Sequence, residues 1–593
     1  MNSNQQSDFS VIKRLGRYMW RYKGMTLLAF LFVFASSLLL TAIPLAARWF
    51  IDQFLGTESQ TSLGMKTGQF LLFYYGIFLL RVLTTYLGQL SFAYVSNSIV
   101  RDLRTDIFSH IQSLGMSFYD QTPAGSIVSR VTNDTQAVAD MFSTVFSSFI
   151  SSMILFLVTL TTMFQLDGQL TIWILPFLPL IWLFITLYRR LSNQLIHMTR
   201  ATLSDINVKL SESIEGMRIV QAFRQEKRLI DEFEQINQKH LYYANRSVDV
   251  NSILLRPAMS LLQVLAYAVI LTFFGLNWKN TGFTAGLVYA FIQYINQLFN
   301  PLIDVTQNFA TLQTSMIAAS RVFQMMDRKD YEPQQVGQIE QIDQGNISFE
   351  HVSFSYDGKQ DVLKNISFQV KKGEMIAFVG HTGSGKSSII NLIMRFYEFD
   401  RGNIWIDGQN IKAYRPATLR KNIGLVLQEP FLYHGTVESN IRMYQEQLSR
   451  KEVEEAAQFV DASDFIEQLP DGYDQVVTER GTTFSAGQRQ LLAFARTIAS
   501  QPKILILDEA TANIDSETEE VIQTSLKKMR QGRTTIAIAH RLSTIQDADC
   551  IYVLDKGRII ESGTHEDLLS LKGTYFNMYQ LQAGMLTNEK NRA

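Results

Sequence analysis

The chain has 593 residues, of which 47% are hydrophobic and 18% charged, and its formal net charge is −1. This length exceeds what one hydrophobic core usually serves, so we expect two or more domains. The near-neutral charge gives no reason to expect a nucleic-acid partner, and the single cysteine, Cys550, excludes a disulfide or a cysteine-based zinc site within the chain.

The first 300 residues contain six apolar segments long enough to cross a bilayer, which requires about 20 residues of helix. Only the second segment is interrupted by a charge, at Arg81. Six such segments in series predict an α-helical membrane domain rather than a set of buried soluble helices. The segments are Met25–Ala47, Gln69–Val95, Met141–Leu166, Gly168–Tyr188, Pro257–Trp278 and Thr281–Ile303.

Basic residues indicate the orientation of these segments. Five of them, Lys13, Arg14, Arg17, Arg21 and Lys23, precede the first segment, and Arg189 to Leu255 is also basic. The alternate loops are poor in Lys and Arg, so the positive-inside rule predicts that both termini are cytoplasmic. The first apolar run is longer than a signal-peptide core, and no cleavage site precedes it. We therefore expect a multi-pass protein of a plasma membrane, most simply a bacterial one.

Long stretches between the apolar segments are amphipathic and predict helices that continue well past the membrane. Proline and glycine between Gly115 and Gly125 predict a turn there. Arg81 and Asp304 lie in or beside the spans, where an ionisable group either faces a substrate path or an interhelical partner, or reaches toward a helix end. Aromatic and methionine side chains in the spans face either a broad apolar cavity or lipid and other helices.

Composition changes after the last span, and the pattern becomes one of short strands alternating with helices, as in a P-loop α/β domain. The sequence thus predicts five parts. These are a cytoplasmic segment (1–24), a six-helix membrane domain (25–325), a linker (326–345), a nucleotide-binding domain (346–585) and a tail (586–593).

The segment Gly380–Ser387 fits the phosphate-loop pattern GxxxxGK[ST] in full, between an apolar strand and a helix. Its glycines allow backbone N–H groups to surround phosphates, and the helix N-terminus adds a positive dipole end. We expect Lys386 to reach the β- and γ-phosphates and the Ser387 hydroxyl to bind Mg²⁺.

A second apolar strand, Ile504–Leu507, ends in Asp508 and Glu509. A carboxylate at Asp508 suits a water-mediated contact with Mg²⁺, and Glu509 is placed to polarise an attacking water. A third strand ends before His540, which we expect near the γ-phosphate or that water.

In this order the motifs resemble those of ATP-binding cassette (ABC) half-exporters, over about residues 10 to 585. The resemblance implies that Tyr356 stacks on adenine, that Gly380 to Ser388 is the Walker A loop, and that Gln428 senses Mg²⁺. It also implies a loop at Glu479–Gly481, a signature at Phe484–Gln488, a D-loop ending at Asp515 and a switch histidine at His540. Turns near Phe118–Gly125 and Gly216–Phe223 would be coupling helices. The Walker A residues expected at ATP are Gly380, Thr382, Gly383, Ser384, Gly385, Lys386, Ser387 and Ser388.

The chain departs from this family at the signature, where Phe-Ser-Ala-Gly-Gln replaces the usual Leu-Ser-Gly-Gly-Gln. The resemblance implies that Ser485, Ala486, Gly487 and Gln488 contact ATP held by a partner cassette. A Cβ at Ala486 would make a positive φ costly there. The D-loop, Ala512–Asp515, is also altered, whereas Glu509 is retained. This combination resembles the catalytic-glutamate-bearing subunit of LmrC–LmrD-like heterodimeric bacterial multidrug exporters.

The sequence therefore predicts ATP-driven export of amphipathic or hydrophobic, drug-like compounds by alternating access, with a second half-exporter as partner. A homodimer that tolerates Ala486 is the alternative, as is a lipid flippase or an ATP-gated channel of the same architecture. Six spans argue against a soluble cassette ATPase, and fusion of the two domains argues against an importer. A peptide exporter with an N-terminal cysteine protease is disfavoured, because no cysteine precedes the first span.

Overall fold

The computed structural model describes residues 8–55, 63–254, 256–277, 284–335, 337–443, 445, 447–478, 481–508, 516–539 and 544–581. The chain forms two compact units. The first, a helical unit, combines Met1–Gln112 with Ala124–Arg328, and the second, an α/β unit, combines Ser113–Pro123 with Lys329–Ala593. The fold class predicted from the sequence is confirmed, and each unit is described by itself below.

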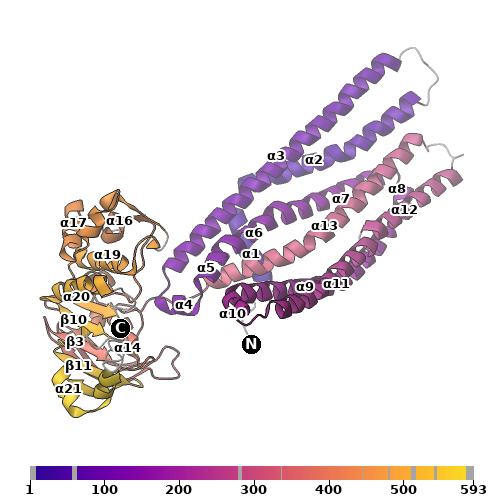
Figure 1. The fold of residues 1–593 in the computed structure, drawn as a ribbon. Helices are drawn as coiled ribbons and strands as arrows, with labels where there is room; N and C mark the ends of the chain where they lie inside the picture. Colours follow the sequence, from indigo (N-terminus) through magenta and orange to yellow (C-terminus); the bar gives the residue numbers. More distant parts are fainter. Residues whose placement is uncertain are drawn as a thin grey trace. The chain divides into compact units, whose positions relative to one another are not determined.

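The helical unit is built of long helices that lie side by side (Figure 1). Among the described residues, five stretches, some made of consecutive helices, are long and apolar enough to cross a membrane: Lys23–Gln53, Thr67–Gln112, Ala124–Leu166, Gly168–Glu215 and Glu226–Leu276. Helix α13 contains most of the sixth predicted span, whose first residues, 281–283, lie outside the described part. The helices are α1 (Asp8–Arg21), α2 (Lys23–Phe50), α3 (Leu63–Gln112), α5 (Ala124–Ser129), α6 (Thr135–Asp140), α7 (Ser147–Leu166), α8 (Gly168–Ile174), α9 (Phe177–Glu215), α10 (Met217–Ala222), α11 (Glu226–Leu254), α12 (Arg256–Asn277) and α13 (Ala285–Met326).

In the described part of the unit, π-helical segments interrupt this pattern at η1 (Ile51–Leu55), η3 (Arg130–Asp134) and η4 (Met141–Phe146). Such segments widen the backbone spiral locally and are frequent at functional sites. In η3, Asp134 accepts two hydrogen bonds from the Arg321 guanidinium, at 2.9 and 2.5 Å, and joins this helix to α13. In η1, the Asp52 carboxylate accepts from the Thr284 hydroxyl at 2.7 Å and from the Gly286 N–H at 2.9 Å.

The core of the helical unit lies between α7, α8, α9, α12 and α13. Tyr294 is fully buried there and donates a hydrogen bond to the Thr41 carbonyl at 2.7 Å, which satisfies the only polar group of that side chain. Arg81 is half-buried on α3 and Asp304 is exposed on α13. Within the described residues neither side chain forms an ion pair, so the structure does not supply the interhelical partner considered for them.

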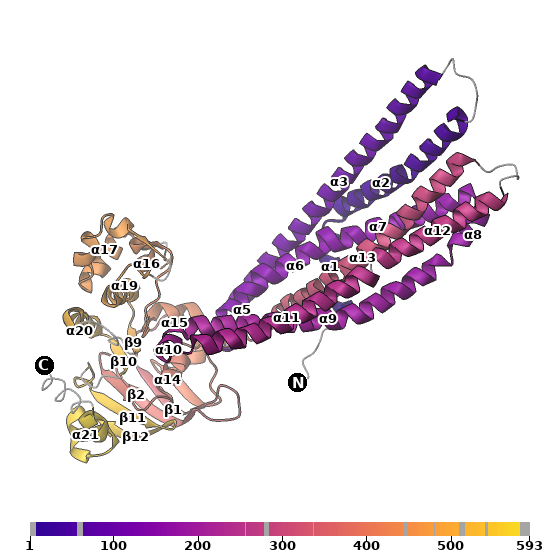
Figure 2. The same cartoon turned by 45° about the vertical axis from the view of Figure 1, so that its right-hand side comes forward.

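The α/β unit contains a six-stranded sheet in the order β12-β11-β3-β10-β9-β6 and a four-stranded antiparallel sheet in the order β2-β1-β4-β5 (Figure 2). Strands β11, β3, β10, β9 and β6 run parallel, as expected from the alternation of strands and helices. The strands are β1 (Ile347–Phe354), β2 (Leu363–Val370), β3 (Met375–Val379), β4 (Arg401–Ile406), β5 (Gln409–Asn410), β6 (Ile423–Val426), β7 (Gly435–Thr436), β8 (Val476–Val477), β9 (Ile504–Asp508), β10 (Thr534–Ile538), β11 (Cys550–Asp555) and β12 (Arg558–Gly563).

Hydrophobic clusters fill both faces of the six-stranded sheet, because its central strands β3 and β10 are buried along their whole length. One cluster includes the side chains between the two sheets, and the other packs the helices that follow β7 and β8. The helices of this unit are α4 (Met116–Gln121), α14 (Lys386–Ile393), α15 (Pro416–Asn422), α16 (Val437–Arg442), α17 (Arg450–Phe459), α18 (Ser463–Glu467), α19 (Ala486–Ala499), α20 (Ser516–Arg530) and α21 (His565–Leu571).

Candidate functional site: a phosphate loop, a signature turn and an apolar cavity

The phosphate loop joins the end of β3 to the start of α14, the position that the sequence predicts. Gly380, Gly383 and Gly385 have φ values of +153°, +83° and +106°, which side chains with a Cβ rarely adopt. A Cβ on Gly380 would also overlap the carbonyl oxygen of Leu554. The glycines of the motif are therefore required by the backbone path of the loop itself.

The polar groups of this loop suit a bound polyphosphate. Lys386 is only 6% exposed, and its ammonium donates to the carbonyl oxygens of Gly380 at 2.8 Å and His381 at 3.2 Å. The buried hydroxyl of Ser384 has no hydrogen-bond partner among the described residues, which is costly unless a ligand supplies one. Thr382, Gly383 and Ser387 are exposed to solvent.

Asp508 and Gln428 lie at the same sheet edge as the phosphate loop. Asp508 is the last residue of β9, and Gln428 follows β6 by two residues. Strand β10 pairs with β9 through Ile538 and Asp508, and with β3 through Ile538 and Phe378. The carboxyl ends of parallel strands form the usual ligand-binding edge of such a sheet, so the register brings these groups toward one side of the phosphate loop.

Several predicted residues lie outside the described part of the chain. They are Glu509, the D-loop Ala512–Asp515, His540, and Glu479 and Arg480 of the loop before the signature. The strands that precede Glu509 and His540 are described. Strand β9 ends at Asp508 and β10 ends at Ile538, and the two strands are neighbours in the sheet.

Tyr356, the residue expected against adenine, is 42% exposed beside the phosphate loop. Its hydroxyl shares a hydrogen bond of 3.0 Å with the Ser388 hydroxyl and accepts one of 3.1 Å from the Asn391 amide, both on α14. Its ring packs edge-on against Tyr397, with 4.8 Å between centroids. This leaves part of an aromatic face open close to the loop, as stacking on a base requires.

Tyr397 connects this aromatic pair to α4. Its hydroxyl donates to the carboxylate of Asp120, and both burial and this hydrogen bond raise the pKa of Tyr397 above its usual value, so the hydroxyl stays protonated. On the same helix Phe118 is 1% exposed, and the Gly115 N–H donates to the Asp330 carbonyl at 2.7 Å. The first turn predicted to be a coupling helix thus packs within the α/β unit. The second, α10, has no buried residue.

The signature turn begins helix α19. Ser485 caps the helix, because its hydroxyl accepts from the Gln488 N–H at 3.2 Å while the Gln488 side chain accepts from the Ser485 N–H at 3.0 Å. Ala486 and Gly487 are the first two helical residues. A positive φ at Ala486 was the concern raised by the sequence, and it does not apply, because the capping box places this residue in a right-handed helix.

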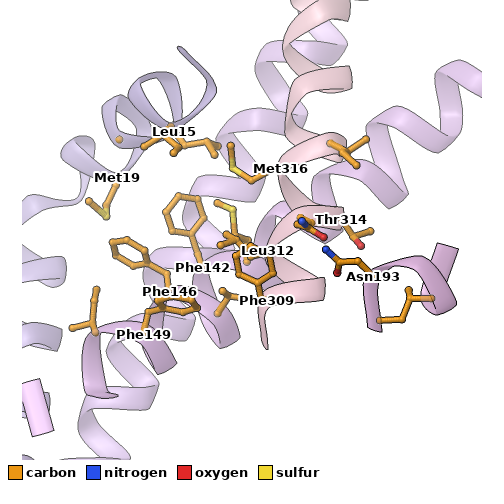
Figure 3. Close-up of a pocket in the computed structure, with 18 of the residues that line it drawn as sticks. Leu15, Met19, Phe142, Phe146, Phe149, Asn193, Phe309, Leu312, Thr314 and Met316 are labelled. Carbon is orange, nitrogen blue, oxygen red and sulfur yellow. The ribbon is translucent and has the colours of Figure 1, made fainter. Parts of the chain in front are cut away.

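The helical unit holds a cavity of about 1000 Å³ between α1, η4, α7, α9 and α13 (Figure 3). Aromatic side chains from three of these elements, Phe142, Phe146, Phe149 and Phe309, form much of its wall. Met19 and Met316 add flexible apolar groups, and Asn193 and Thr314 are polar. A volume of this size is typical of sites for drug-sized molecules. The sequence suggested an apolar cavity without indicating which helices would form it.

Comparison with known families matches both units. The family described as ABC transporter transmembrane region matches residues 26–302, and the family described as ABC transporter matches residues 363–512.

Relatives match over most of the chain. An ABC transporter ATP-binding protein of Streptococcus pneumoniae, exp8, is 61% identical over 99% of this chain and 99% of its own length. A multidrug resistance ABC transporter ATP-binding/permease protein of Bacillus subtilis, YheH, is 43% identical over 84% of this chain and 74% of its own length. The solved structure of a bacterial Atm1-family ABC exporter with ATP bound has a TM-score of 0.77 and 29% identity, and the match covers 95% of this chain and 98% of that one.

Proposed function

Because the chain belongs to the ABC exporters, whose half-transporters dimerise in a lipid bilayer and couple ATP hydrolysis to transport, we propose that it is one half of a heterodimeric exporter. The cargo is an amphipathic or hydrophobic compound, moved across the cytoplasmic membrane by alternating access with both termini in the cytoplasm. The α/β unit binds ATP and is an ATPase domain. The boundaries 25–325, 326–345 and 346–585 form part of this proposal, supported by α13 ending at Met326 and β1 beginning at Ile347.

One contrast carries the proposal of a heterodimer. The phosphate loop keeps every glycine that its backbone requires, whereas the signature turn has Ala486 at a position that faces a second cassette in the proposed dimer. An ATP molecule held by this chain would be completed by the partner's signature and hydrolysed. One held by the partner would be completed by Ser485 to Gln488 and mainly retained. The two sites would therefore differ in turnover.

Each proposed role at the hydrolytic site follows from side-chain chemistry and position. Tyr356 stacks on adenine, Lys386 neutralises phosphate charge, and the loop glycines admit backbone N–H donors. Glu509 orients the attacking water, and His540 steadies the charge that develops on the phosphoryl group. The Lys386 ammonium lies at the loop, where it donates to two carbonyl oxygens, and this position supports its proposed role.

Magnesium fits the same edge of the sheet. The hydroxyl of Ser387, the amide oxygen of Gln428 and the carboxylate of Asp508 are hard oxygen donors of the kind Mg²⁺ prefers, and Asp508 suits a contact through water. Bound there, Mg²⁺ would neutralise charge on the β- and γ-phosphates. The structure places Asp508 and Gln428 at the ends of neighbouring parallel strands, which supports this assignment.

Purified protein, alone and with candidate partner half-exporters, tests the proposal in lipid vesicles. The expected result is slow ATP turnover and slow dye export by the chain alone, and fast turnover and export by the correct pair. Fast ATPase activity and transport by the chain alone would reject the heterodimer and favour a homodimer. Vesicles loaded with fluorescent lipid in place of dye separate drug export from lipid flipping.

A further inference from the structure

The cavity of the helical unit has two chemically different ends (Figure 3). Phe142, Phe146 and Phe149 lie at one side of the view, and Asn193 and Thr314 lie at the other. The phenylalanines follow one another along η4 and α7 with spacings of four and three residues, so they share one helix face. The rings of Phe142 and Phe146 pack edge-on, with 5.9 Å between centroids. This face gives the cavity a continuous aromatic wall.

Basic side chains lie at the polar end. Asn193, His197 and Arg200 line the cavity from one face of α9, at spacings of four and three residues. The Arg200 guanidinium donates to the Thr314 hydroxyl on α13 at 3.4 Å, and Arg189 stacks on Phe309 at 3.6 Å from the ring centroid. Among the described residues that line the cavity none is acidic, and Arg200, His197 and Arg189 form no ion pair in the described part of the chain.

The cavity lies where the uncharged runs of two spans end, a position that suits a ligand with an apolar and a polar part. The lining from η4 and α7 begins at Met141, where the uncharged run of the third span starts. The basic end lies beyond Tyr188, where the uncharged run of the fourth span stops. The cavity therefore straddles one boundary between hydrocarbon and water. Helix α1 closes one side with Ile12, Leu15 and Met19. It also carries several basic residues and an exposed Trp20, a pattern typical of helices that lie in the membrane interface.

The π-helical segment η4 forms part of the cavity wall, and such segments are frequent at functional sites. Four of its six residues, Met141, Phe142, Val145 and Phe146, line the cavity. Residues one, four and five positions apart lie on one broad helix face, so these four side chains reach the cavity together.

From this arrangement we infer that the cavity binds an anionic amphiphile, an alkyl chain ending in a carboxylate or phosphate, at the membrane boundary. The chain lies against the phenylalanine face, and the head group meets Arg200, His197 and the polar groups of Asn193 and Thr314. This inference rests on the proposed function, because it names the class of cargo. A cationic amphiphile would place like charges together at the basic end, so the cavity selects against it.

Binding to the full-length protein in detergent or nanodiscs tests the charge preference without a partner or ATP. The probe is a dansyl-labelled undecanoate, compared with its uncharged methyl ester, and dodecyltrimethylammonium serves as a cationic competitor. The carboxylate is expected to bind at least about tenfold more tightly than the ester, the ratio expected for one charge-assisted hydrogen bond. Equal affinities, no detectable binding of the carboxylate, or efficient displacement by the cation would each overturn the inference.

Variants locate the site. Arg200→Gln is expected to reduce the preference for carboxylate over ester to less than about threefold while leaving ester affinity unchanged. Phe149→Leu is expected to weaken both probes by the same factor. Arg190→Gln is the matched control, because Arg190 is an exposed arginine on α9 that does not line the cavity. An undiminished preference in Arg200→Gln, or the same loss in Arg190→Gln, would overturn the assignment.

Separate experiments identify the source of the ligand and test the proposed export activity. Adding anionic phospholipid to the nanodiscs should displace the probe if the natural ligand is a membrane lipid, and a single-chain fatty acid should displace it if the ligand is a free amphiphile. If the chain binds the probe but exports no dye from vesicles with ATP, Mg²⁺ and any of the candidate partners, the proposed export function is refuted and the binding site stands.

Discussion

Replacing Ala486 by glycine separates the two explanations of the altered signature. Because Ala486 is the first residue of α19, with Ser485 as the cap, the change does not relieve backbone strain. It should instead weaken the helix, by at most about 1 kcal/mol, which lowers the melting temperature of a domain of this size by about 2–4 °C at most. What glycine would restore is space for a close approach of phosphate to the first N–H groups of the helix.

The expected gain in activity follows from that approach. A hydrogen bond to a charged group contributes about 1.5–3 kcal/mol, and each 1.4 kcal/mol in a barrier corresponds to about tenfold in rate. If the Cβ of Ala486 prevents one such contact in the transition state, Ala486→Gly should raise ATP turnover of the purified chain by roughly tenfold to a hundredfold. Turnover is measured as phosphate release in lipid vesicles with saturating Mg²⁺ and ATP.

The control is Ala417→Gly, an exposed alanine in the first turn of α15. It should produce a similar loss of stability with unchanged turnover. A turnover in Ala486→Gly within twofold of the unmodified chain would refute the reasoning, because the methyl group would then have no part in the asymmetry. High turnover of the unmodified chain alone would remove the asymmetry itself.

Three further changes test other parts of the structure. Glu509→Gln should keep ATP binding, measured with a fluorescent nucleotide, and lose nearly all hydrolysis; unchanged hydrolysis would remove Glu509 from its proposed role. Asp134→Ala leaves the half-exposed Arg321 without its bidentate partner. The free energy of unfolding should fall by about 1–3 kcal/mol, which is measured as a lower melting temperature in detergent. An unchanged melting temperature would show that this pair does not stabilise the helical unit. Tyr397→Phe keeps the ring beside Tyr356 but removes the hydrogen bond to Asp120. Nucleotide affinity should stay within about twofold, while stimulation of ATPase activity by a transported compound should fall. Full stimulation would exclude a coupling role for this hydrogen bond.

Features encoded by neighbouring residues could be predicted from the sequence. The phosphate loop has glycine wherever its backbone takes a positive φ, so these positions can be recognised in the sequence. The spans leave runs of uncharged residues, and the predicted third and fourth spans, Met141–Leu166 and Gly168–Tyr188, leave only Asp167 between them. In the structure Asp167 caps α8 by accepting from the Leu170 N–H at 3.0 Å.

Features made by distant residues could not be predicted in this way. The hydrogen bond from Tyr397 to Asp120 joins residues 277 positions apart, and the pair of Arg321 and Asp134 joins residues 187 apart. The residues around each partner do not reveal the pairing. A polar side chain that faces solvent and one that faces a distant helix can have the same kinds of neighbour in the sequence. The π-helical segments were also missed, since they depend on packing rather than on residue type. The phenylalanine spacing in η4 and α7 was visible, but it equally fits a face turned toward lipid.

The two turns proposed to contact nucleotide differ in what a substitution does to the chain itself. In the phosphate loop a Cβ at Gly380 would overlap the Leu554 carbonyl, so such a change would damage the fold of its own cassette. At Ala486 the capping box already provides a helical backbone, and a methyl group there is compatible with the isolated chain. In the proposed dimer, its effect would arise where a second molecule approaches the start of α19. Such a change leaves the fold of its own subunit intact and acts across the dimer interface. By changes of this kind, two half-exporters can acquire unequal ATP sites while both remain stable.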